Sequence, residues 1–296
     1  MASGNGRRKP DPAHSEAAGP AAAVVRRAVR LKAGRAEGVD ELVAEERPLT
    51  VYVDGEELAT LVASPTDLEE LLVGFLTSEG VIAGPDEIRW MAVAPENGEA
   101  WVATRGGSGI GAHDRLMRHV EIATCCGRTR PTAYFQSDLE PLRRLRSPAP
   151  GAVLSAAAAG AVMRTLEERT RTALFGATGG VHSALLAGPD GEVLALRSDV
   201  GRHNALDKLY GFALLARITT DATVIAFSGR ISSEVLLKVA KIGSPILLSK
   251  SAPTSLALEL AEDLGITTVG FIRDDRMTVY TAPQRIAGAA PPAPSG

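Results

Sequence analysis

The sequence predicts an α/β protein whose second half forms a helix-covered, largely parallel sheet and whose first half forms a smaller α+β lobe. After residue 150, helical patterns alternate with short apolar runs rich in β-branched residues, which is typical of parallel strands covered by helices. In the first half, Asp54-Gly55 and Asn97-Gly98 each separate two apolar runs. Both dipeptides favour tight hairpin turns, so this half should hold two hairpins around one helix.

The elements of the first lobe follow from local signals. Strands are expected at 49–53 and 58–62, and again at 91–93 and 101–103. Ser64 is expected to cap the helix between the hairpins, because Pro65 suits the first helical position and Asp67 complements the helix dipole. Apolar residues at 68, 71, 72, 75 and 76 follow at helical spacing, and Gly80 ends the helix.

The second half repeats strands and helices. The expected helices are 152–168, 204–216, 232–242 and 253–264, and the expected strands are 182–187, 192–197, 223–227, 245–248, 267–272 and 278–281. In such sheets, ligands bind at the carboxyl ends of the strands. Polar clusters at 228–230, 249–251 and 273–276 lie at these ends, which makes them candidate binding segments.

Domain limits follow from composition. We expect a disordered basic tail at 1–40, the N-terminal α+β lobe at 41–135 with a cysteine loop at 124–130, the α/β core at 150–286, and a flexible C-terminal tail at 287–296. Residues 1–35 hold eight basic and two acidic side chains. A solvated extension is preferred over an arm that binds a phosphate-rich partner.

Composition excludes several classes of protein. A chain of 296 residues with 45% hydrophobic residues can bury a large core without disulfides or a structural metal. The net charge of −3 and the aromatic content of 4% argue against nucleic-acid binding. No unbroken apolar run of about 18 residues predicts a membrane span, and no signal peptide is evident. The only two cysteines are adjacent, which excludes a disulfide framework and favours a reducing, cytoplasmic location.

The cysteine loop is the first candidate for chemistry. Residues 124–130 read Thr-Cys-Cys-Gly-Arg-Thr-Arg. The thiolate is the reactive form of cysteine, and neighbouring arginines favour it by lowering the thiol pKa. Cys125 and Cys126 are therefore candidate nucleophiles beside Arg128 and Arg130. The alternative is a buried pair of small apolar side chains, against which the two arginines argue.

The segment 199–208 is the second candidate. It ends a strand and begins a helix, with Asn204 as a candidate cap. Arg202, His203 and Lys208 offer donors beside a helix N-terminus, which suits a phosphate group. A structural turn whose polar side chains satisfy the local backbone explains the same residues equally well, and the sequence leaves both interpretations open.

Several motifs in order resemble the FdhD/NarQ family of accessory sulfurtransferases of formate dehydrogenase maturation. The resemblance covers residues 48–286. Its most specific pieces are TGGVHS at 178–183, DVGRHNALDK at 199–208, SGRIS at 228–232, SAPTS at 251–255 and VGFIR at 269–273.

The resemblance implies a cytidine-deaminase-like layered core without the deaminase zinc chemistry, and a homodimer. It implies that a cysteine desulfurase charges a cysteine of this chain as a persulfide. The sulfur then passes to the bis-guanine-dinucleotide molybdenum cofactor, which goes to an apo formate dehydrogenase. The segment similar to the family's cofactor-binding segment comprises Phe271, Ile272, Arg273, Asp274, Asp275 and Arg276. Its arginines can each donate two hydrogen bonds to phosphate oxygens, and a carboxylate can accept hydrogen bonds from the edge of a guanine base.

The sequence departs from the family at the cysteine loop. The family commonly carries Cys-Gly-x-Cys-Gly, whereas residues 126–130 read Cys-Gly-Arg-Thr-Arg. Cys126 matches the first cysteine, Thr129 replaces the second, and Cys125 stands where serine is common. Ser198 also stands where the family often has glutamate. We assign the persulfide to Cys126, with Cys125 as second candidate. The alternative is a non-catalytic escort that binds the molybdenum cofactor and docks the apo dehydrogenase.

Overall fold

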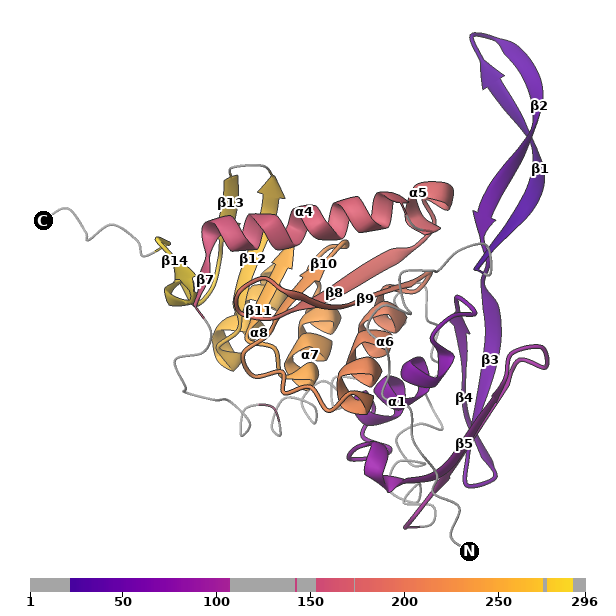
Figure 1. Cartoon of the computed structure of the whole chain (residues 1–296), viewed down its shortest axis with the longest axis horizontal. Helices are drawn as coiled ribbons and strands as arrows, with labels where there is room; N and C mark the ends of the chain where they lie inside the picture. Colours follow the sequence, from indigo (N-terminus) through magenta and orange to yellow (C-terminus); the bar gives the residue numbers. More distant parts are fainter. Residues whose placement is uncertain (1–21, 107–141, 143–152, 173, 274–275, 290–296) are drawn as a thin grey trace, which may run out of the picture.

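The computed structural model describes residues 22–106, 142, 153–172, 174–273 and 276–289. Figure 1 shows a small N-terminal sheet with one helix beside a larger sheet covered by helices, and a narrow two-stranded ribbon that extends from the body. The cysteine loop at 124–130 and the expected limits of the lobes near 135 and 150 lie outside the described residues. In the part of the chain that is described, no helix is long and apolar enough to cross a membrane.

The N-terminal lobe contains both expected hairpins. Strands β3 (Arg47–Val53), β4 (Glu56–Ala63), β5 (Ile88–Ala94) and β6 (Glu99–Thr104) form a sheet in the order β4-β3-β6-β5. Asp54 and Gly55 have positive φ angles, as the tight turn between β3 and β4 requires. Helix α1 (Leu68–Ser78) packs its apolar side on this sheet and ends before Gly80, and the turn η3 (Pro85–Glu87) leads into β5.

The larger sheet has six strands in the order β13-β12-β11-β10-β8-β9. These strands are β8 (His182–Ala187), β9 (Val193–Asp199), β10 (Val224–Phe227), β11 (Ile246–Ser249), β12 (Thr267–Arg273) and β13 (Arg276–Val279). Of its neighbouring pairs, only β10–β11 and β11–β12 are parallel, and β8 runs antiparallel to both β10 and β9. The expectation of a largely parallel sheet is wrong at both edges, because β8–β9 and β12–β13 are joined by short connections, and such connections produce antiparallel pairs.

Helices cover both faces of this sheet. Helices α6 (Arg202–Leu215), α7 (Ser233–Ile242) and α8 (Ser255–Leu264) pack on one face, and α4 (Ala156–Thr172) packs on the other (Figure 1). Strand β10 contributes side chains to the hydrophobic core on both faces of the sheet. Ile225 and Phe227 pack in the core with α6 and α7, whereas Val224 and Ala226 pack in the core with α4. The mixed α/β class is therefore confirmed, and the likeness of this core to cytidine deaminases stays a prediction.

Three short elements complete the core. Helix α5 (Leu174–Thr178) follows α4, and strand β7 (Leu154–Ser155) pairs in parallel with β14 (Ile286–Ala287), which follows the turn η4 (Pro283–Arg285). The sequence predicts a flexible tail from residue 287. Ala287 instead pairs with Ser155, so the ordered chain continues beyond the predicted limit.

The first ribbon corrects the prediction of a disordered tail for residues 23–40, whereas residues 1–21 lie outside the described part of the chain. Strands β1 (Ala23–Lys32) and β2 (Arg35–Ala44) pair along their whole length around a turn at Ala33 and Gly34, both with positive φ. Three of the four basic residues of β1 lie opposite acidic residues of β2, with Arg27 opposite Asp40 as one example, and the fourth, Lys32, lies opposite Arg35 beside the turn. Opposite charges across an antiparallel pair are stabilising. The basic residues that predict a solvated tail therefore stabilise a hairpin here.

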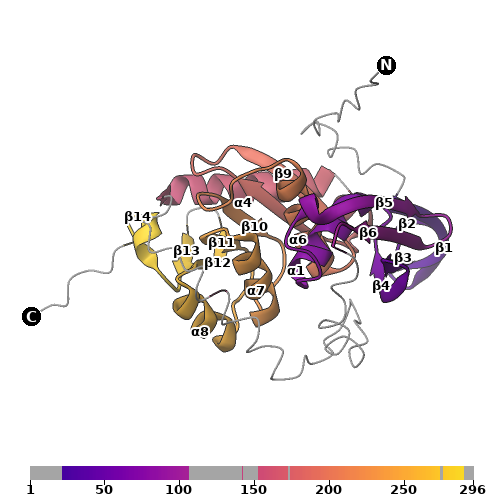
Figure 2. The same ribbon diagram turned by 90° about the horizontal axis from the view of Figure 1, so that it is seen from below.

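The two lobes meet where α1 crosses α6, and the two views in Figures 1 and 2 both place these helices side by side. A Cβ atom on Gly74 would lie 1.8 Å from the carbonyl oxygen of Asp207, and one on Gly211 would lie 1.9 Å from that of Glu70. The two helix backbones therefore touch at a pair of glycines. Beside them, the Arg197 guanidinium forms a two-point ion pair with Glu70.

Candidate functional site at the carboxyl edge of the sheet

The carboxyl ends of β10, β11 and β12 meet the start of β8 at one edge of the large sheet. His182 lies at this edge because β8 runs antiparallel to β10. Hydrogen bonds join the loops that follow the strands. The Ser249 hydroxyl donates to the Gly229 carbonyl oxygen at 2.8 Å, and the Ser251 amide donates to the Ser249 hydroxyl at 2.9 Å. Two of the expected polar clusters, 228–230 and 249–251, thus form one connected edge.

His182 occupies a half-buried position in this edge. Its ring stacks against Phe227 with 6.2 Å between ring centroids. A Cβ on Gly229 would lie 2.9 Å from the Phe227 ring and 3.3 Å from His182 Nδ1, so only glycine fits there without a shift. Burial, and then the positive charge of Arg202, lower the pKa of His182 below its usual 6.5. The imidazole is therefore neutral at pH 7 and can accept or donate a proton at this edge.

Arg202 and His203, at the start of α6, contact Glu234 in the first turn of α7. Glu234 Oε2 lies 3.1 Å from His203 Nε2 and 3.4 Å from Arg202 Nη2. The contact with His203, and then the positive charge of Arg202, hold the pKa of Glu234 at about 2. The Glu234 carboxylate is thus charged at neutral pH and engages two of the donors that the sequence offered to a phosphate.

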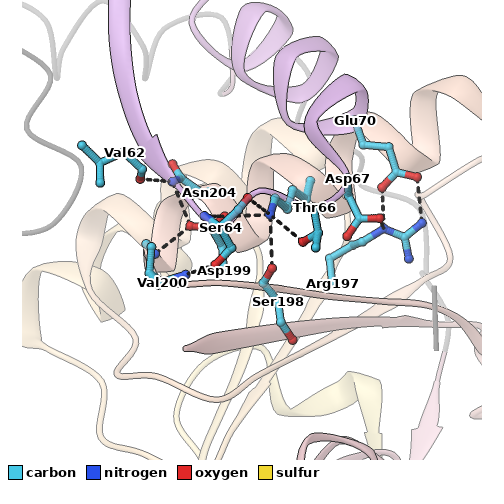
Figure 3. A network of polar contacts seen from close by, with 12 residues as sticks. Val62, Ser64, Thr66, Asp67, Glu70, Arg197, Ser198, Asp199, Val200 and Asn204 are labelled. Atoms are coloured by element: carbon cyan, nitrogen blue, oxygen red, sulfur yellow. Dashed lines mark hydrogen bonds and ion pairs between the residues drawn. The ribbon is translucent and has the colours of Figure 1, made fainter. Parts of the chain in front are cut away.

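The third of those donors, Lys208, belongs to a buried network whose members Ser64, Ser198 and Asp199 are labelled in Figure 3. Its Nζ lies 2.7 Å from Asp199 Oδ2 and donates to the carbonyl oxygens of Ser64 and Ser198. Neither Lys208 nor Asp199 has solvent-exposed side-chain surface. Asp199 Oδ1 also accepts from the Gly201 amide at 2.8 Å. Of the two interpretations of 199–208, the structure supports the structural turn, because Lys208 cannot reach a solvent-borne ligand.

This network also corrects both predicted helix caps. The Ser64 amide donates to Asp199 Oδ2 at 3.0 Å, and its hydroxyl accepts from the Val200 amide. Helix α1 begins instead after Asp67, which has a left-handed backbone and no side-chain cap. Asn204 donates to Asp199 Oδ1 and to the Val62 carbonyl oxygen, and the cap of α6 is Gly201. Ser64 and Asn204 have the chemistry of helix caps, but they form hydrogen bonds to residues of the other lobe and not to the amides of their own helices. These two side chains therefore join the lobes.

The predicted cofactor segment lies at the end of β12. Phe271 has a φ of 51° and a side chain that is 46% exposed, at a bulge between Gly270 and Arg273. Arg273 and Arg276 are both exposed and lie opposite each other across β12 and β13. Ile272 is buried in the core, so it anchors the strand. Asp274 and Asp275 lie outside the described residues.

Arg273 is tied to the neighbouring loop. Its Nη1 donates to the Lys250 carbonyl oxygen at 2.7 Å and to its own strand at Ile272, and the Phe271 amide donates to Ser251. The structure therefore joins the segment 271–276 to the same edge as His182 and Ser249. It cannot place Cys125 and Cys126, which lie outside the described residues.

The sequence motifs alone assign no role to His182 or Glu234. His182 belongs to the quoted TGGVHS motif and is the first residue of the strand expected at 182–187, a signal that could have marked it as a strand-end residue. Glu234 carries no such signal, since an acidic residue in the first turn of a helix is common. Among the described residues, no three His, Cys, Asp or Glu side chains gather as metal ligands.

Comparison with known proteins decides the family. The sequence model of the FdhD/NarQ family matches residues 44–287. This chain belongs to the FdhD/NarQ family. The resemblance inferred from the motifs is thereby confirmed, and the matched range includes every element of the described lobes except the first ribbon.

Relatives of known name agree with this assignment. The chain is 43% identical over 261 residues to the sulfur carrier protein FdhD of Shouchella clausii, covering 87% of this chain and 94% of that protein. It is 45% identical over 257 residues to the protein of the same name from Listeria innocua, covering 87% and 96%. The crystal structure of a proposed formate dehydrogenase accessory protein from Desulfotalea psychrophila has a TM-score of 0.70 at 29% identity, covering 89% of this chain and 99% of that one.

Proposed function

We propose that this chain is a sulfur carrier required for formate dehydrogenase activity. It accepts persulfide sulfur from a cysteine desulfurase and delivers it to the bis-guanine-dinucleotide molybdenum cofactor, which is its substrate, before the cofactor enters an apo formate dehydrogenase. The observation that carries this proposal is identity of 43% to 46% over more than four fifths of the chain to proteins named as sulfur carriers. The cytoplasm, where thiols are kept reduced, is the fitting compartment.

Cys126 receives the sulfur in this proposal. Its thiolate attacks the outer sulfur of the donor persulfide, the S–S bond of the donor breaks, and the donor cysteine leaves as a thiolate. Arg128 and Arg130 stabilise the attacking thiolate by their charge. The match of Cys126 and Gly127 to the family motif supports the assignment, and Cys125 is the second candidate.

The segment 271–276 binds the cofactor in this proposal. The exposed ring of Phe271 offers a face on which a guanine base can stack. Arg273 and Arg276 can bind phosphate oxygens through charged hydrogen bonds. Because Arg273 is already held by the carbonyl oxygens of Lys250 and Ile272, it loses less side-chain freedom on binding than a free arginine would. The described residues therefore fit a guanine nucleotide.

Thr129 favours a second candidate function. It replaces the second cysteine of the family motif, so a mechanism that needs two cysteines at that spacing fails here. An escort that binds the cofactor and docks the apo dehydrogenase, without sulfur chemistry, needs neither cysteine.

Maturation of a formate dehydrogenase in cells that lack their own carrier distinguishes these functions. We expect Cys126→Ser to abolish the activity of the dehydrogenase and Cys125→Ser to retain most of it, since a hydroxyl is common at position 125 in the family. If Cys125→Ser were inactive and Cys126→Ser active, the residue assignment would be wrong. If both single variants and the double variant matured the dehydrogenase, the escort function would replace the sulfur carrier.

A further inference from the structure

The four-stranded sheet of the N-terminal lobe is covered by a helix on only one face within the described residues. Leu71, Leu72 and Phe75 of α1 pack in the hydrophobic core on that face. Helix α1 lies between the sheet and α6, so the second face, hereafter the outer face, points away from the large lobe (Figure 1). Side chains alternate between the faces of a strand, and residues opposite each other on paired strands share a face. The outer face therefore carries Tyr52, Glu57, Trp90, Glu99 and Trp101.

The outer face gathers aromatic side chains in a chain that has few of them. Aromatic residues make up 4% of the sequence, yet both of its tryptophans lie here. The rings of Tyr52 and Trp101 stack with 4.1 Å between their centroids. Trp90, on the neighbouring edge strand β5, is 54% exposed. Tryptophan and tyrosine contribute most of the binding energy in many protein interfaces, so this grouping marks a surface that binds another protein.

The charge around these rings indicates the chemistry of the partner. Residues 45–106 hold thirteen acidic and three basic side chains. Glu57 lies opposite Tyr52, and Glu99 precedes Trp101 by two residues on the same face. Neither glutamate forms an ion pair with a described residue. An arginine side chain can stack on an aromatic ring and pair with a neighbouring carboxylate, so the outer face fits a basic protein surface that presents arginines.

The outer face is remote from the proposed cofactor segment. Strands β12 and β13, which carry residues 271–276, lie at one edge of the large sheet, and the small lobe joins the other edge, where Arg197 of β9 pairs with Glu70 of α1. Figures 1 and 2 both place the small sheet and β13 at opposite ends of the molecule. A protein bound to the outer face therefore leaves the cofactor segment open.

We propose that the outer face docks the protein that donates sulfur, through a basic, arginine-bearing surface of that donor. This inference rests on the proposed sulfur-carrier function. The recipient of the cofactor must reach residues 271–276, whereas the donor must reach the cysteines, and the chain enters the cysteine segment from β6 of this sheet. Trp90 and the Tyr52–Trp101 pair form the apolar centre of the contact, and the acidic lobe attracts and orients the donor.

Sulfur loading from two different donors tests the docking face. The protein is incubated either with a cysteine desulfurase at low concentration and cysteine, or with free cysteine persulfide, and its gain in mass is followed over time. Trp90→Ala should slow loading from the desulfurase by roughly tenfold or more. Loading from free cysteine persulfide should be unchanged, because a small donor needs no docking surface. Leu256→Ala on α8 is the matched control, since Leu256 is 45% exposed outside this face.

A charge reversal tests the basic character of the donor. Glu57→Lys should slow loading from the desulfurase by roughly threefold or more at low ionic strength, and the difference should disappear at high salt, which screens exposed charges. Glu259→Lys changes the net charge equally but lies on α8, so it should load like the wild type at both ionic strengths. Equal effects of the two reversals would refute docking through the outer face.

The two donors separate failure of this inference from failure of the sulfur-carrier function. Loading of Trp90→Ala by the desulfurase at the wild-type rate would overturn the docking face, and so would an equal loss with free cysteine persulfide, which would locate the damage at the cysteine. A wild type loaded by free cysteine persulfide but not by the desulfurase would also overturn it. A changed sedimentation mass of Trp90→Ala would assign the face to a second copy of this chain. A wild type that gains sulfur from neither donor would instead contradict the proposed function.

Discussion

The buried ion pair between Lys208 and Asp199 shows what the DVGRHNALDK motif does in this chain. A lysine ammonium without exposed surface is costly unless a carboxylate and further acceptors surround it. Here Asp199 Oδ2 and two carbonyl oxygens fill that role, and one of those oxygens belongs to Ser64 in the N-terminal lobe. The motif therefore fixes the position of one lobe on the other beside the candidate site.

Replacing Lys208 tests this role. Lys208→Met keeps most of the side-chain volume but leaves the Asp199 charge buried without its partner, which should lower the free energy of unfolding by about 3–5 kcal/mol. The matched control is Lys250→Met, because Lys250 pairs with Glu167 where both side chains are 41% exposed. Its loss should stay below about 1 kcal/mol. Urea unfolding of the two variants would contradict the structural role if their losses were equal.

Arg273 and Arg276 allow a test of the proposed substrate segment. Because each charged hydrogen bond to phosphate contributes about 1.5–3 kcal/mol, Arg273→Ala and Arg276→Ala should each weaken binding of GDP, which represents half of the dinucleotide cofactor, by roughly tenfold or more. Arg217→Ala is the control, since Arg217 is exposed and pairs with Asp86 far from this segment in the fold. Equal GDP affinity of the wild type and the double variant in calorimetry would place the nucleotide elsewhere.

The crossing of α1 and α6 depends on glycine. In an exposed helix, replacing glycine by alanine stabilises by about 1 kcal/mol. At Gly74 the new Cβ would lie 1.8 Å from a backbone oxygen of α6, so the helices would have to separate. We expect Gly74→Ala to destabilise the protein by about 1–3 kcal/mol despite its better helix propensity.

Gly84→Ala is the matched control, because a Cβ there meets no atom within 4 Å and the backbone is extended. Its melting temperature should stay close to that of the wild type. A Gly74→Ala protein as stable as this control would show that the helices do not touch as described.

Elements with strong local signals could be predicted from the sequence. The tight turn at Asp54-Gly55 forms as expected, and the second hairpin forms around a four-residue loop that ends in Asn97-Gly98. Each of the four helices predicted in the second half begins and ends within four residues of its expected limits, whereas the short helix α5 was not predicted. Helix-cap predictions were wrong where the residue binds a partner that is distant in the sequence. Ser64 and Asn204 have the chemistry of helix caps, but Asp199 and Val62 bind them across the lobe boundary. The β1–β2 ribbon could not be predicted from composition, because what stabilises it is the position of acidic residues of β2 opposite basic residues of β1.

The candidate site was predictable in part for a similar reason. The rule that ligands bind at the carboxyl ends of strands located the clusters at 228–230, 249–251 and 273–276, and hydrogen bonds join their loops. That rule could not indicate that His182 joins them, because the antiparallel direction of β8 is a property of the assembled sheet. It also could not show that Lys208 is buried, since burial follows from the docking of the N-terminal lobe.

The whole molecule is thus a two-lobed body whose sheet edge carries a nucleotide-binding segment in our proposal, with a sulfur-carrying cysteine supplied by the chain between the lobes. The most direct measurement is mass spectrometry of the intact protein after incubation with a cysteine desulfurase and cysteine. The wild type and Cys125→Ser should gain the mass of one sulfur atom that a reducing thiol removes, and Cys126→Ser should gain none. A wild type that gains no sulfur while still maturing formate dehydrogenase would contradict the sulfur-carrier function.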